Sequence, residues 1–590
     1  MKNSEKKELL LIFKTHLDIG FTDYAENIVR NYLEVFIPNA IKVGNELKDT
    51  DTPFIWTVGS WLVWEALKHD KDGSVKKAID DGILVWHGLP FTTHTELMNA
   101  MLFEYGLSLS DKLDERFGRK TIAAKMTDVP GHTIGIVPLM KKHGLEFLHL
   151  GVNPATPIPQ VPPVFRWKAG EDEIVVMYQG DYGELEEFDD FVLYFAHTHD
   201  NQGPQSAQEI IQIYEELQAK YPEYHIKAAT LNDVAEKLRE ARNLPVIEKE
   251  IGDTWIHGAG TDPKKVSMYR ELLRYIEKNG IGTADLSDNL LMIPEHTWGR
   301  DIKKCFRMEA EEHYFPEEFE LIDRTIREGA EKSWQEQRDY VKRASVTLNV
   351  PIDYPVEEPN ISNMRELKLI ASGDEEAYIP EIDFEISWQL FDRSGYERYQ
   401  KIYMRTDVIW AIWDFTKVGL PEYQGGIYTA KLRRAYTDGE KYCYYLSFDE
   451  EIADHFGLPH FWVEKAGQYL EIKWFGKKAC RLPQAFWVKF KGMNEDWEIQ
   501  KLGQWIRSED IIGSPLITAV DTGIRNADVQ IESLDAVLVA PFGRRLLDYD
   551  LHPERQDMYF NLYNNIWNTN FPMWYSEDSR FRFCMQKRLK

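Results

Sequence analysis

The sequence has few cysteines and no long apolar run. Its 590 residues include 4 cysteines, at positions 305, 443, 480 and 584, and this wide spacing argues against a disulfide framework and against a cysteine-based zinc site. No apolar run approaches the ~18 residues needed to cross a bilayer. The apolar stretch 9–13 is also too short for the core of a secretory signal. We therefore expect a cytoplasmic protein, in a reducing compartment, that does not bind membranes.

Positive charge is also scarce. The chain has 97 acidic and 70 basic residues, which gives a formal net charge of -27. Binding to nucleic acid or to an anionic membrane needs a basic surface, so neither partner is expected. Aromatic residues make up 13% of the chain and include 18 tryptophans. Although most tryptophans pack in cores, this composition suits stacking against a neutral carbohydrate. The sequence is also compatible with a homo-oligomer.

Three patterns follow one another along the chain. Up to about residue 256, short apolar runs alternate with helical segments such as 207–220 and 231–238, which is typical of a parallel sheet, either open or closed into an irregular barrel. Amphipathic periodicity at 266–278 and 316–343 then predicts a helical bundle. Short aromatic and β-branched runs at 384–389, 442–447, 469–474 and 536–539 predict an antiparallel sandwich. The strands expected in the first part are 9–13, 54–57, 83–86, 121–126, 147–150, 174–178, 192–196, 225–229 and 254–256.

His16 and Asp18 follow the first predicted strand in the run Lys14-Thr15-His16-Leu17-Asp18-Ile19-Gly20-Phe21. Residues i and i+2 of a strand lie on one face, so both side chains can point at one ion. A nitrogen ligand beside an oxygen ligand suits Zn²⁺ or a similar divalent metal better than Ca²⁺ or Mg²⁺. Alone, the pair is better explained by a strand-end histidine beside a loop-capping aspartate.

Two further polar clusters come at strand ends. Asp128 follows the run 121–126 and precedes the turn-forming Pro130-Gly131. Asp200 lies in the segment His197-Thr198-His199-Asp200-Asn201, after another predicted strand. Because the carboxyl ends of parallel strands share one edge of a sheet, three such clusters indicate one site. Ordinary turn chemistry explains Asp200 nearly as well.

These motifs resemble those of glycoside hydrolase family 38, the retaining α-mannosidases. The family pattern His-x-His-x-Asp-x-Gly-Trp corresponds to residues 14–21, with Lys14 in place of the first histidine and Phe21 in place of the tryptophan. Asp128-Val129-Pro130-Gly131-His132 resembles the Asp-Pro-x-Gly-His motif, and Glu295-His296-Thr297-Trp298 resembles the late zinc-binding motif. The segments 563–572 and 581–583 are similar to the closing β-domain signature.

The resemblance implies a fold and a site. The fold would be an irregular seven-stranded type of β/α barrel at 1–262, a helical bundle at 263–345 and a C-terminal antiparallel β-sandwich at 346–590. The metal ligands would be His16, Asp18, Asp128 and His296, holding zinc or another divalent metal. Asp128 would also be the nucleophile of a retaining, exo-acting glycosidase, with Asp200 as the acid/base.

Four other residues are candidates for contact with the sugar. His94 follows a predicted strand, and His132 follows the Pro-Gly turn after Asp128. Trp255 and Asp262 come from the last predicted strand of the barrel and its loop. Each, taken alone, is better explained by a structural hydrogen bond or by packing.

Two other functions fit the same sequence. A zinc-dependent carbohydrate deacetylase could be built on His197, His199 and an aspartate, and it would not need Asp128 or His296 as ligands. A catalytically degenerate sugar-binding relative would explain Lys14 and Phe21, because a cation beside the ligands repels a metal. All four ligands of the resemblance are present, which favours an active enzyme.

Overall fold

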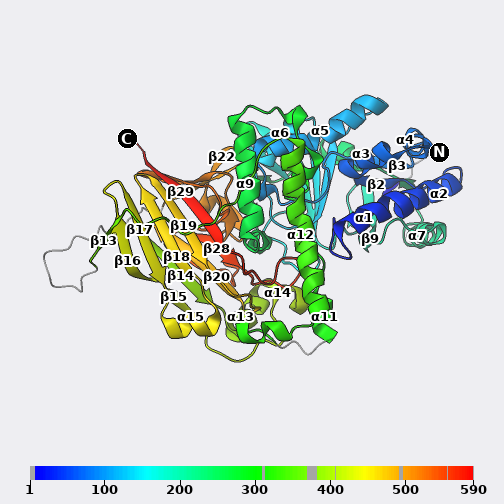
Figure 1. The fold of residues 1–590 in the computed structure, drawn as a ribbon. Helices are drawn as coiled ribbons and strands as arrows, with labels where there is room; N and C mark the ends of the chain where they lie inside the picture. Colours follow the sequence, from blue (N-terminus) through cyan, green and yellow to red (C-terminus); the bar gives the residue numbers. More distant parts are fainter. Residues whose placement is uncertain are drawn as a thin grey trace, which may run out of the picture. The chain divides into compact units, whose positions relative to one another are not determined.

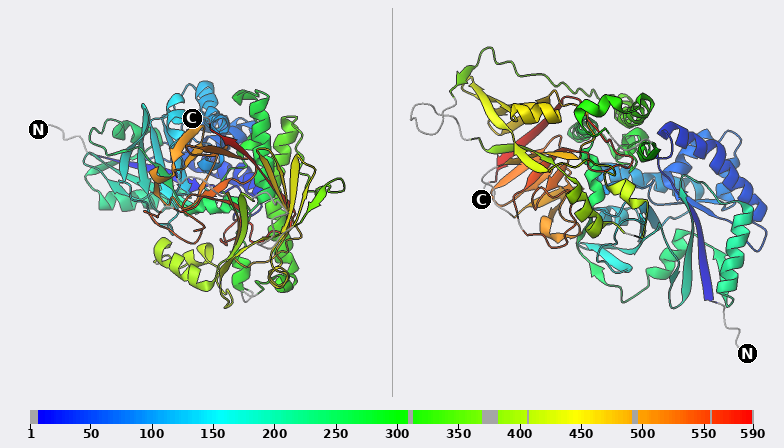
Figure 2. Two further views of the ribbon diagram at one scale, coloured as in Figure 1. Left: turned by 90° about the vertical axis from the view of Figure 1, so that its left-hand side faces the viewer. Right: turned by 90° about the horizontal axis from the view of Figure 1, so that it is seen from below.

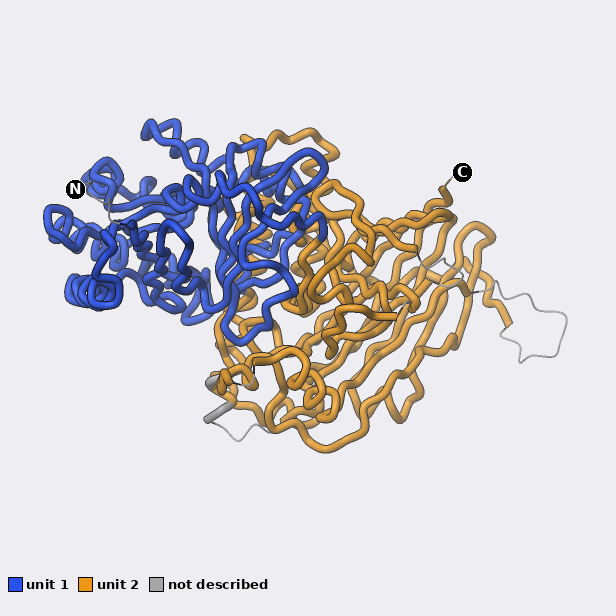
Figure 3. Tube along the Cα trace, turned by 180° about the vertical axis from the view of Figure 1, so that it is seen from behind, with its two compact units in different colours: residues 1–95, 100–249, 294–297 blue, residues 96–99, 250–293, 298–590 orange. Residues whose placement is uncertain are grey.

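The computed structural model describes residues 7–308, 313–368, 382–405, 407–490, 496–554 and 556–588. The chain forms two compact units (Figure 3). Unit 1 consists of residues 1–95, 100–249 and 294–297, and unit 2 consists of residues 96–99, 250–293 and 298–590. The segment 294–297 therefore belongs to unit 1 although both of its flanks belong to unit 2. The domain boundaries expected at 262/263 and 345/346 stay predictions.

Unit 1 contains two sheets in which most neighbouring strands are parallel. The first has the order β3-β2-β1-β9-β8, with β10 also paired to β1, and the second has the order β11-β6-β7-β5-β4. The long strand β1, dark blue in Figure 2, pairs in parallel with β9, β2 and β10. The strands are β1 (Lys7–His16), β2 (Trp56–Gly59), β3 (Leu84–His87), β4 (Ala123–Asp128), β5 (Phe147–Val152), β6 (Val164–Ala169), β7 (Asp172–Gln179), β8 (Glu186–Glu187), β9 (Phe191–Asp200), β10 (Tyr224–Ala228) and β11 (Val246–Ile247).

Helices connect these strands, as right-handed crossovers between parallel strands require. Several begin with clear caps: the Ser206 side chain accepts a hydrogen bond from the amide of Glu209 at the start of α7. The helices of unit 1 are α1 (Ala25–Asn31), the π-helical η1 (Tyr32–Phe36), α2 (Ile37–Leu47), α3 (Ser60–His69), α4 (Ser74–Asp80), α5 (Ala100–Phe117), α6 (Ile136–Lys142), α7 (Ala207–Lys220) and α8 (Leu231–Leu238).

The two sheets of unit 1 share one hydrophobic core. Leu10 and Ile12 of β1 lie in the same buried cluster as Phe147 of β5 and Met177 of β7, and α8 contributes Val234. Unit 1 is therefore mixed α/β with parallel strands around a common core, as predicted. The strand pairings form two sheets, so a single closed barrel stays a prediction.

Unit 2 begins with helices and continues as antiparallel sheets. Its helical elements up to residue 347 are η3 (Thr254–Gly260), α9 (Pro263–Lys278), η4 (Thr283–Asp285), α10 (Asp288–Leu291), α11 (Lys303–Met308), η5 (Pro316–Leu321) and α12 (Arg324–Thr347). Two antiparallel sheets follow, with the orders β13-β16-β17-β18-β19-β29-β26-β25-β21-β22 and β15-β14-β20-β28-β27-β24. Their strands run side by side in Figure 1.

The faces of these two sheets meet through aromatic side chains. Phe583 of one sheet packs edge-on against Phe490 and Phe560 of the other, with ring centroids 5.3 and 5.0 Å apart. A C-terminal antiparallel region is thus confirmed. Its strands are β13 (Arg365–Leu367), β14 (Phe384–Leu390), β15 (Gly426–Thr429), β16 (Lys431–Thr437), β17 (Lys441–Ser447), β18 (His460–Ala466), β19 (Tyr469–Phe475), β20 (Gln484–Phe490), β21 (Glu498–Lys501), β22 (Gln504–Arg507), β24 (Thr518–Ala519), β25 (Gly523–Arg525), β26 (Val529–Ser533), β27 (Leu538–Ala540), β28 (Tyr559–Asn564) and β29 (Ser579–Lys587).

A few short elements of unit 2 lie outside these sheets. The strand β12 (Glu250–Gly252) pairs in parallel with β23 (Ile511–Gly513). The remaining helices are α13 (Arg393–Tyr403), α14 (Ala411–Phe415), the 3₁₀ turn η6 (Ser508–Asp510) and α15 (Glu450–Phe456). The turn η2 (Thr95–Leu97) falls at the first passage from unit 1 to unit 2.

Two predicted elements are wrong. The expected strand 254–256 is the 3₁₀ helix η3, because the Asp253 side chain accepts a hydrogen bond from the amide of Trp255 and starts a helical turn there. The expected single helix 316–343 is divided into η5 and α12. Asp323 interrupts it, because its side chain accepts hydrogen bonds from the amides of Thr325 and Ile326 and so begins a new helix.

No helix in the described ranges combines the length and apolarity needed to span a membrane. The four cysteines are all unpaired. The sequence expectation against a disulfide framework is confirmed by this observation.

Candidate active site and metal centre

The strand β1 brings His16 and Asp18 to the carboxyl edge of the first sheet, where both side chains are buried. His16 Nδ1 lies 2.6 Å from Thr127 Oγ1, so Nε2 is the ring nitrogen that remains for a ligand. This Nε2 is 3.3 Å from Asp18 Oδ1. The loop carrying Asp18 is fixed by Asn201, which accepts a hydrogen bond from the Asp18 amide and donates one to the Asp18 carbonyl, both at 3.1 Å.

Asp128 ends β4 with a left-handed backbone, φ 79°. This conformation is costly for a residue with a side chain, and such positions are frequent at functional sites. Its Oδ1 accepts hydrogen bonds from Asn153 Nδ2 at 2.9 Å and from Tyr182 Oη at 2.8 Å. Its Oδ2 lies 3.8 Å from His296 Nε2. One oxygen of Asp128 is thus held in place and the other faces the histidines.

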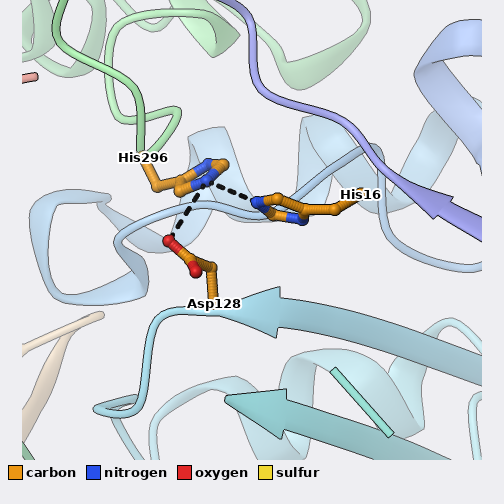
Figure 4. Close-up of side chains that lie close together, drawn as sticks. All are labelled: His16, Asp128 and His296. Carbon is orange, nitrogen blue, oxygen red and sulfur yellow. Dashed lines mark hydrogen bonds and ion pairs between the residues drawn. The ribbon is translucent and has the colours of Figure 1, made fainter. Parts of the chain in front are cut away.

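His296 reaches this site because the segment 294–297 lies along the loop after β3. Thr93 and Glu295 form an antiparallel bridge, and the His94 amide donates to the Pro294 carbonyl at 2.9 Å. His296 Nε2 is then 3.2 Å from His16 Nε2 (Figure 4). It also lies 3.1 Å from Asp18 Oδ1. Its Nδ1 lies 2.7 Å from Glu295 Oε1. A carboxylate behind a histidine in this way is common in zinc proteins, because it fixes the ring and raises its basicity.

The donor set fits a single divalent metal ion. Zinc bound at about 2.0–2.1 Å by tetrahedral ligands separates neighbouring ligand atoms by about 3.3 Å. His296 Nε2 lies 3.2 Å from His16 Nε2, 3.1 Å from Asp18 Oδ1 and 3.8 Å from Asp128 Oδ2, and His16 Nε2 lies 3.3 Å from Asp18 Oδ1. Within the described residues, Asp18 Oδ2 is buried with no hydrogen-bond partner. A buried carboxylate oxygen without a partner is expensive, so this atom is well suited to coordinate a cation.

The charges of the neighbouring side chains also favour a cation at this position. Burial opposes ionisation of Asp18, but the neighbouring His16 and His296 rings hold its pKa well below the usual range. Burial likewise disfavours a charged His296, yet the carboxylates of Glu295 and Asp18 raise the pKa of the ring well above its usual value. The carboxylates around His296 thus favour a positive charge at this position.

Asp200 ends β9 and lies opposite His16 in the strand pairing. Burial raises the pKa of Asp200 to about 6, and the neighbouring carboxylate of Asp18 adds to the effect. Tyr182 Oη lies 2.9 Å from Asp200 Oδ1 as well as 2.8 Å from Asp128 Oδ1. The phenol oxygen is therefore within hydrogen-bond distance of both carboxyl groups, and its single hydrogen can be donated to one of them at a time.

Tyr182 is a site residue that the sequence interpretation missed. It lies in the loop after β7, where both Asp181 and Tyr182 have left-handed backbones, φ 49° and 62°. Gly151 of β5 makes room for it, because a Cβ there would lie 2.4 Å from the Tyr182 carbonyl. The Tyr182 ring also stacks on His16, with centroids 4.8 Å apart. The only signal in the sequence is the run Gly180-Asp181-Tyr182-Gly183 at a strand end.

Two of the residues predicted to bind the sugar, His94 and His132, belong to unit 1. Both are buried. His132 Nε2 lies 3.1 Å from the Val129 carbonyl, and its Nδ1 lies 3.3 Å from Thr95 Oγ1. His132 thus braces the turn after Asp128, and its contact with a sugar stays a prediction.

The other two, Trp255 and Asp262, belong to unit 2 and are buried there. The Trp255 ring packs against Trp567 and Phe415, with centroids 5.7 and 6.0 Å apart. Asp262 caps α9 and accepts two hydrogen bonds from the guanidinium of Arg338, at 2.7 and 2.9 Å. These contacts give both residues a structural role in unit 2, and their contact with a sugar stays a prediction.

The histidines of the rival deacetylase site are not arranged as ligands. His199 is exposed, and the ring of His197 packs 5.1 Å from the ring of Tyr182. Among the described residues, the groups able to hold a metal are His16, Asp128 and His296, and His16, Asp18 and Asp200. In each group the donor atoms lie within 4.8 Å of one another.

Among the comparisons with known proteins, those with solved structures bear on the fold. Residues 259–367 match a sequence family described only as a domain of unknown function (DUF5054). No curated protein sequence matches the chain. Among solved structures, an alpha-mannosidase from Enterococcus faecalis V583 matches with a TM-score of 0.61 and 10% identity, covering 99% of this chain and 87% of that one. A glycosyl hydrolase family 38 protein from Enterococcus faecalis matches with a TM-score of 0.55 and 10% identity, covering 99% and 86%. The chain thus shares the fold of these two structures over nearly its whole length.

Proposed function

We propose that the protein is a metal-dependent, retaining glycoside hydrolase that acts on α-mannosides or closely similar sugars. The observation that carries the proposal is the meeting of His16, Asp18 and Asp128 around His296, from three separate segments of the chain: His296 Nε2 lies 3.2 Å from His16 Nε2, 3.1 Å from Asp18 Oδ1 and 3.8 Å from Asp128 Oδ2. The likeness to an alpha-mannosidase structure supports the choice of sugar.

The four ligands would hold zinc or another divalent ion. When bound, such an ion supplies a positive charge and open coordination positions for sugar hydroxyls. Burial of His16, Asp18 and His296 favours a terminal sugar, which can enter a pocket, over the middle of a polysaccharide. We therefore include exo-action in the proposal.

Asp128 would act as the nucleophile. Asn153 and Tyr182 hold its Oδ1 and so orient the carboxylate. In a retaining reaction this carboxylate forms a covalent bond to the sugar as the leaving oxygen departs.

Asp200 would act as the acid and then as the base. Its raised pKa, about 6, keeps it protonated in mildly acidic solution, so that it can donate a proton to the leaving oxygen. In the second step the same group, now ionised, would take a proton from water. Tyr182, between the two carboxyl groups, would position them for these roles.

The two alternatives have less support. The deacetylase would use His197 and His199, which do not belong to a metal-binding group in the part of the chain that the structure describes. The degenerate relative was suggested by Lys14. Lys14 Nζ donates to the Thr15 carbonyl at 2.9 Å, and burial lowers the pKa of Lys14 to about 7, which weakens the repulsion that this alternative requires.

The two carboxylates can be separated by leaving-group chemistry. Asp128→Asn should abolish turnover of every aryl α-mannoside, because no covalent intermediate can form. Asp200→Ala should slow substrates with poor leaving groups by about 10²–10⁴-fold. Dinitrophenyl glycosides, whose departure needs no proton, should suffer far less, and azide should restore the second step. Equal damage to both substrates without azide rescue would remove Asp200 from its role.

A further inference from the structure

A network of hydrogen bonds runs inside unit 1 from the half-buried Glu186 to the backbone of Tyr182. It passes through three buried side chains, Gln179, His149 and Lys125. Lys125 of β4 lies directly opposite His149 of β5 in the strand pairing, Gln179 ends β7 and Glu186 belongs to β8. The proposed function assigns no role to these four side chains.

The side-chain amide of Gln179 fixes the direction of the network. Its Oε1 accepts a hydrogen bond from the Glu184 amide at 3.3 Å, and its Nε2 donates to Glu186 Oε2 at 3.1 Å. His149 Nε2 lies 2.9 Å from the same Oε1, so this ring nitrogen carries a proton. Burial lowers the pKa of His149 well below the usual value, so the ring is neutral and its Nδ1 is an acceptor.

Lys125 joins the network to the loop of Tyr182. Its Nζ lies 2.6 Å from His149 Nδ1 and 2.6 Å from the Tyr182 carbonyl oxygen. Both atoms are acceptors, so Lys125 donates a hydrogen bond to each. Burial lowers the pKa of Lys125, but an ammonium and a neutral amine both have enough N–H groups for two donations. The ring of Phe195, with its centroid 4.4 Å from Nζ, also helps to fix this nitrogen.

The backbone of Tyr182 needs such support. Asp181 and Tyr182 both have left-handed backbones, which persist only where the surrounding structure holds them. The Tyr182 amide donates to the Val152 carbonyl at 3.2 Å, and the Tyr182 carbonyl accepts from Lys125. Both backbone polar atoms of Tyr182 are thus held, and the direction of its side chain follows from them.

We propose that Lys125, held in place by His149 and Gln179, is a positioning residue for the Tyr182 hydroxyl. Loss of the Lys125 hydrogen bond would let the Tyr182 backbone relax. The hydroxyl, which lies 2.8 and 2.9 Å from the two proposed catalytic carboxyl groups, would move with it. The inference rests on the proposed function, because Lys125 acts on the reaction only through Tyr182.

A double-mutant cycle tests this role. Lys125→Met keeps a long apolar side chain but cannot donate, so kcat/KM for aryl mannosides should fall by about 10–100-fold. In the Tyr182→Phe background, the same change should cost about twofold or less, because the hydroxyl that it displaces is already absent. Equal losses in the two backgrounds would show that Lys125 supports the fold and not the hydroxyl, and would overturn the proposal.

Lys7→Met is the matched control for this cycle. It removes another lysine of unit 1 that donates to a backbone carbonyl, that of Asp189 at 2.7 Å. Its kcat/KM should stay at the wild-type value.

A crystal structure of Lys125→Met gives a result that needs no activity. The Tyr182 hydroxyl should leave hydrogen-bond distance of at least one of the two carboxyl groups, and an unmoved Tyr182 would overturn the proposal. A wild type that hydrolyses no glycoside would contradict the proposed function, while this structure would still decide whether Lys125 positions Tyr182. If Lys125→Met does not fold, Gln179→Leu, which removes the acceptor of His149 Nε2, should displace the hydroxyl in the same way, and an unmoved Tyr182 there would likewise overturn the proposal.

Discussion

At the residue scale, three of the four proposed metal ligands are fixed through their other polar atom. Thr127 contacts Nδ1 of His16, Glu295 lies beside Nδ1 of His296, and Asn153 and Tyr182 hold Oδ1 of Asp128. Such supporting contacts orient ligands before the metal arrives and reduce the entropy lost on binding. The site is therefore preorganised by residues that the family motifs do not contain.

Tyr182 gives the sharpest test among these supports. Tyr182→Phe removes the hydroxyl that stabilises ionised Asp200, so the pKa of Asp200 should rise and the alkaline limb of the pH-activity profile should move to higher pH. We expect kcat/KM for aryl mannosides to fall by about 10–100-fold. Tyr214→Phe is a matched control, because Tyr214 donates to the Pro53 carbonyl in the same unit. An unchanged profile and rate in Tyr182→Phe would show that the bridge has no positioning role.

At the element scale, the site is assembled where strands end. His16 ends β1, Asp128 ends β4 and Asp200 ends β9. Close contact between neighbouring elements is also needed, since Gly151 in β5 lets the backbone of Tyr182 approach. Glycine is required here because a side chain would collide with this backbone, and not because of its own backbone conformation.

Gly151→Ala should displace the loop of Tyr182. The new methyl group would lie 2.4 Å from the Tyr182 carbonyl, which cannot move without shifting the hydroxyl between Asp128 and Asp200. We expect a loss of about 1–3 kcal/mol in stability and a loss of activity at temperatures where the variant is folded. Gly282→Ala is the control, since its Cβ would find its nearest neighbour at 3.6 Å. Wild-type activity and unfolding midpoint in Gly151→Ala would contradict this explanation.

The 3₁₀ helix η3 of unit 2 gives a pH prediction. Burial raises the pKa of Asp253, which caps this helix, to about 7. The folded state therefore binds a proton more tightly than the unfolded state between about pH 4 and pH 7, and this contribution to stability is lost as the pH rises through about 7. Asp253→Asn keeps the oxygen that accepts from Trp255 and Tyr403 but cannot ionise. The fall in unfolding midpoint from pH 5 to pH 8 should therefore be smaller in this variant, and an equal fall in both proteins would exclude Asp253 as its cause.

The sequence predicts regular elements well and the links between distant segments poorly. Apolar runs located β1, β4 and β9, and helical periodicity located α7 and α8, because these signals are local. The bridge between Thr93 and Glu295, which positions His296, joins residues about 200 positions apart, and no local pattern encodes it. His296 was found only through its resemblance to a motif. Tyr182 was missed because its role depends on the absence of a side chain at Gly151.

At the scale of the whole molecule, the same fold is maintained at 10% identity to an alpha-mannosidase structure. At this low sequence identity a shared fold does not show a shared activity, so the function has to be inferred from the residues of the site. The segment 294–297 belongs to unit 1 while its flanks belong to unit 2, and it carries the fourth proposed ligand. Formation of the site therefore requires chain segments separated by nearly 280 residues to come together.

The most direct measurement is the metal content of purified wild type, His16→Ala and His296→Ala, determined by mass spectrometry after dialysis against metal-free buffer. We predict about one divalent ion, zinc for preference, per wild-type chain, and a similar large loss in both variants, because a site with few ligands depends on each. His225→Ala, which removes an exposed histidine of the same unit, should keep the ion. Glycosidase activity should follow the metal and disappear with a chelator. A metal-free wild type with full glycosidase activity, or a His296→Ala protein with full metal content and activity, would contradict the proposed metal centre.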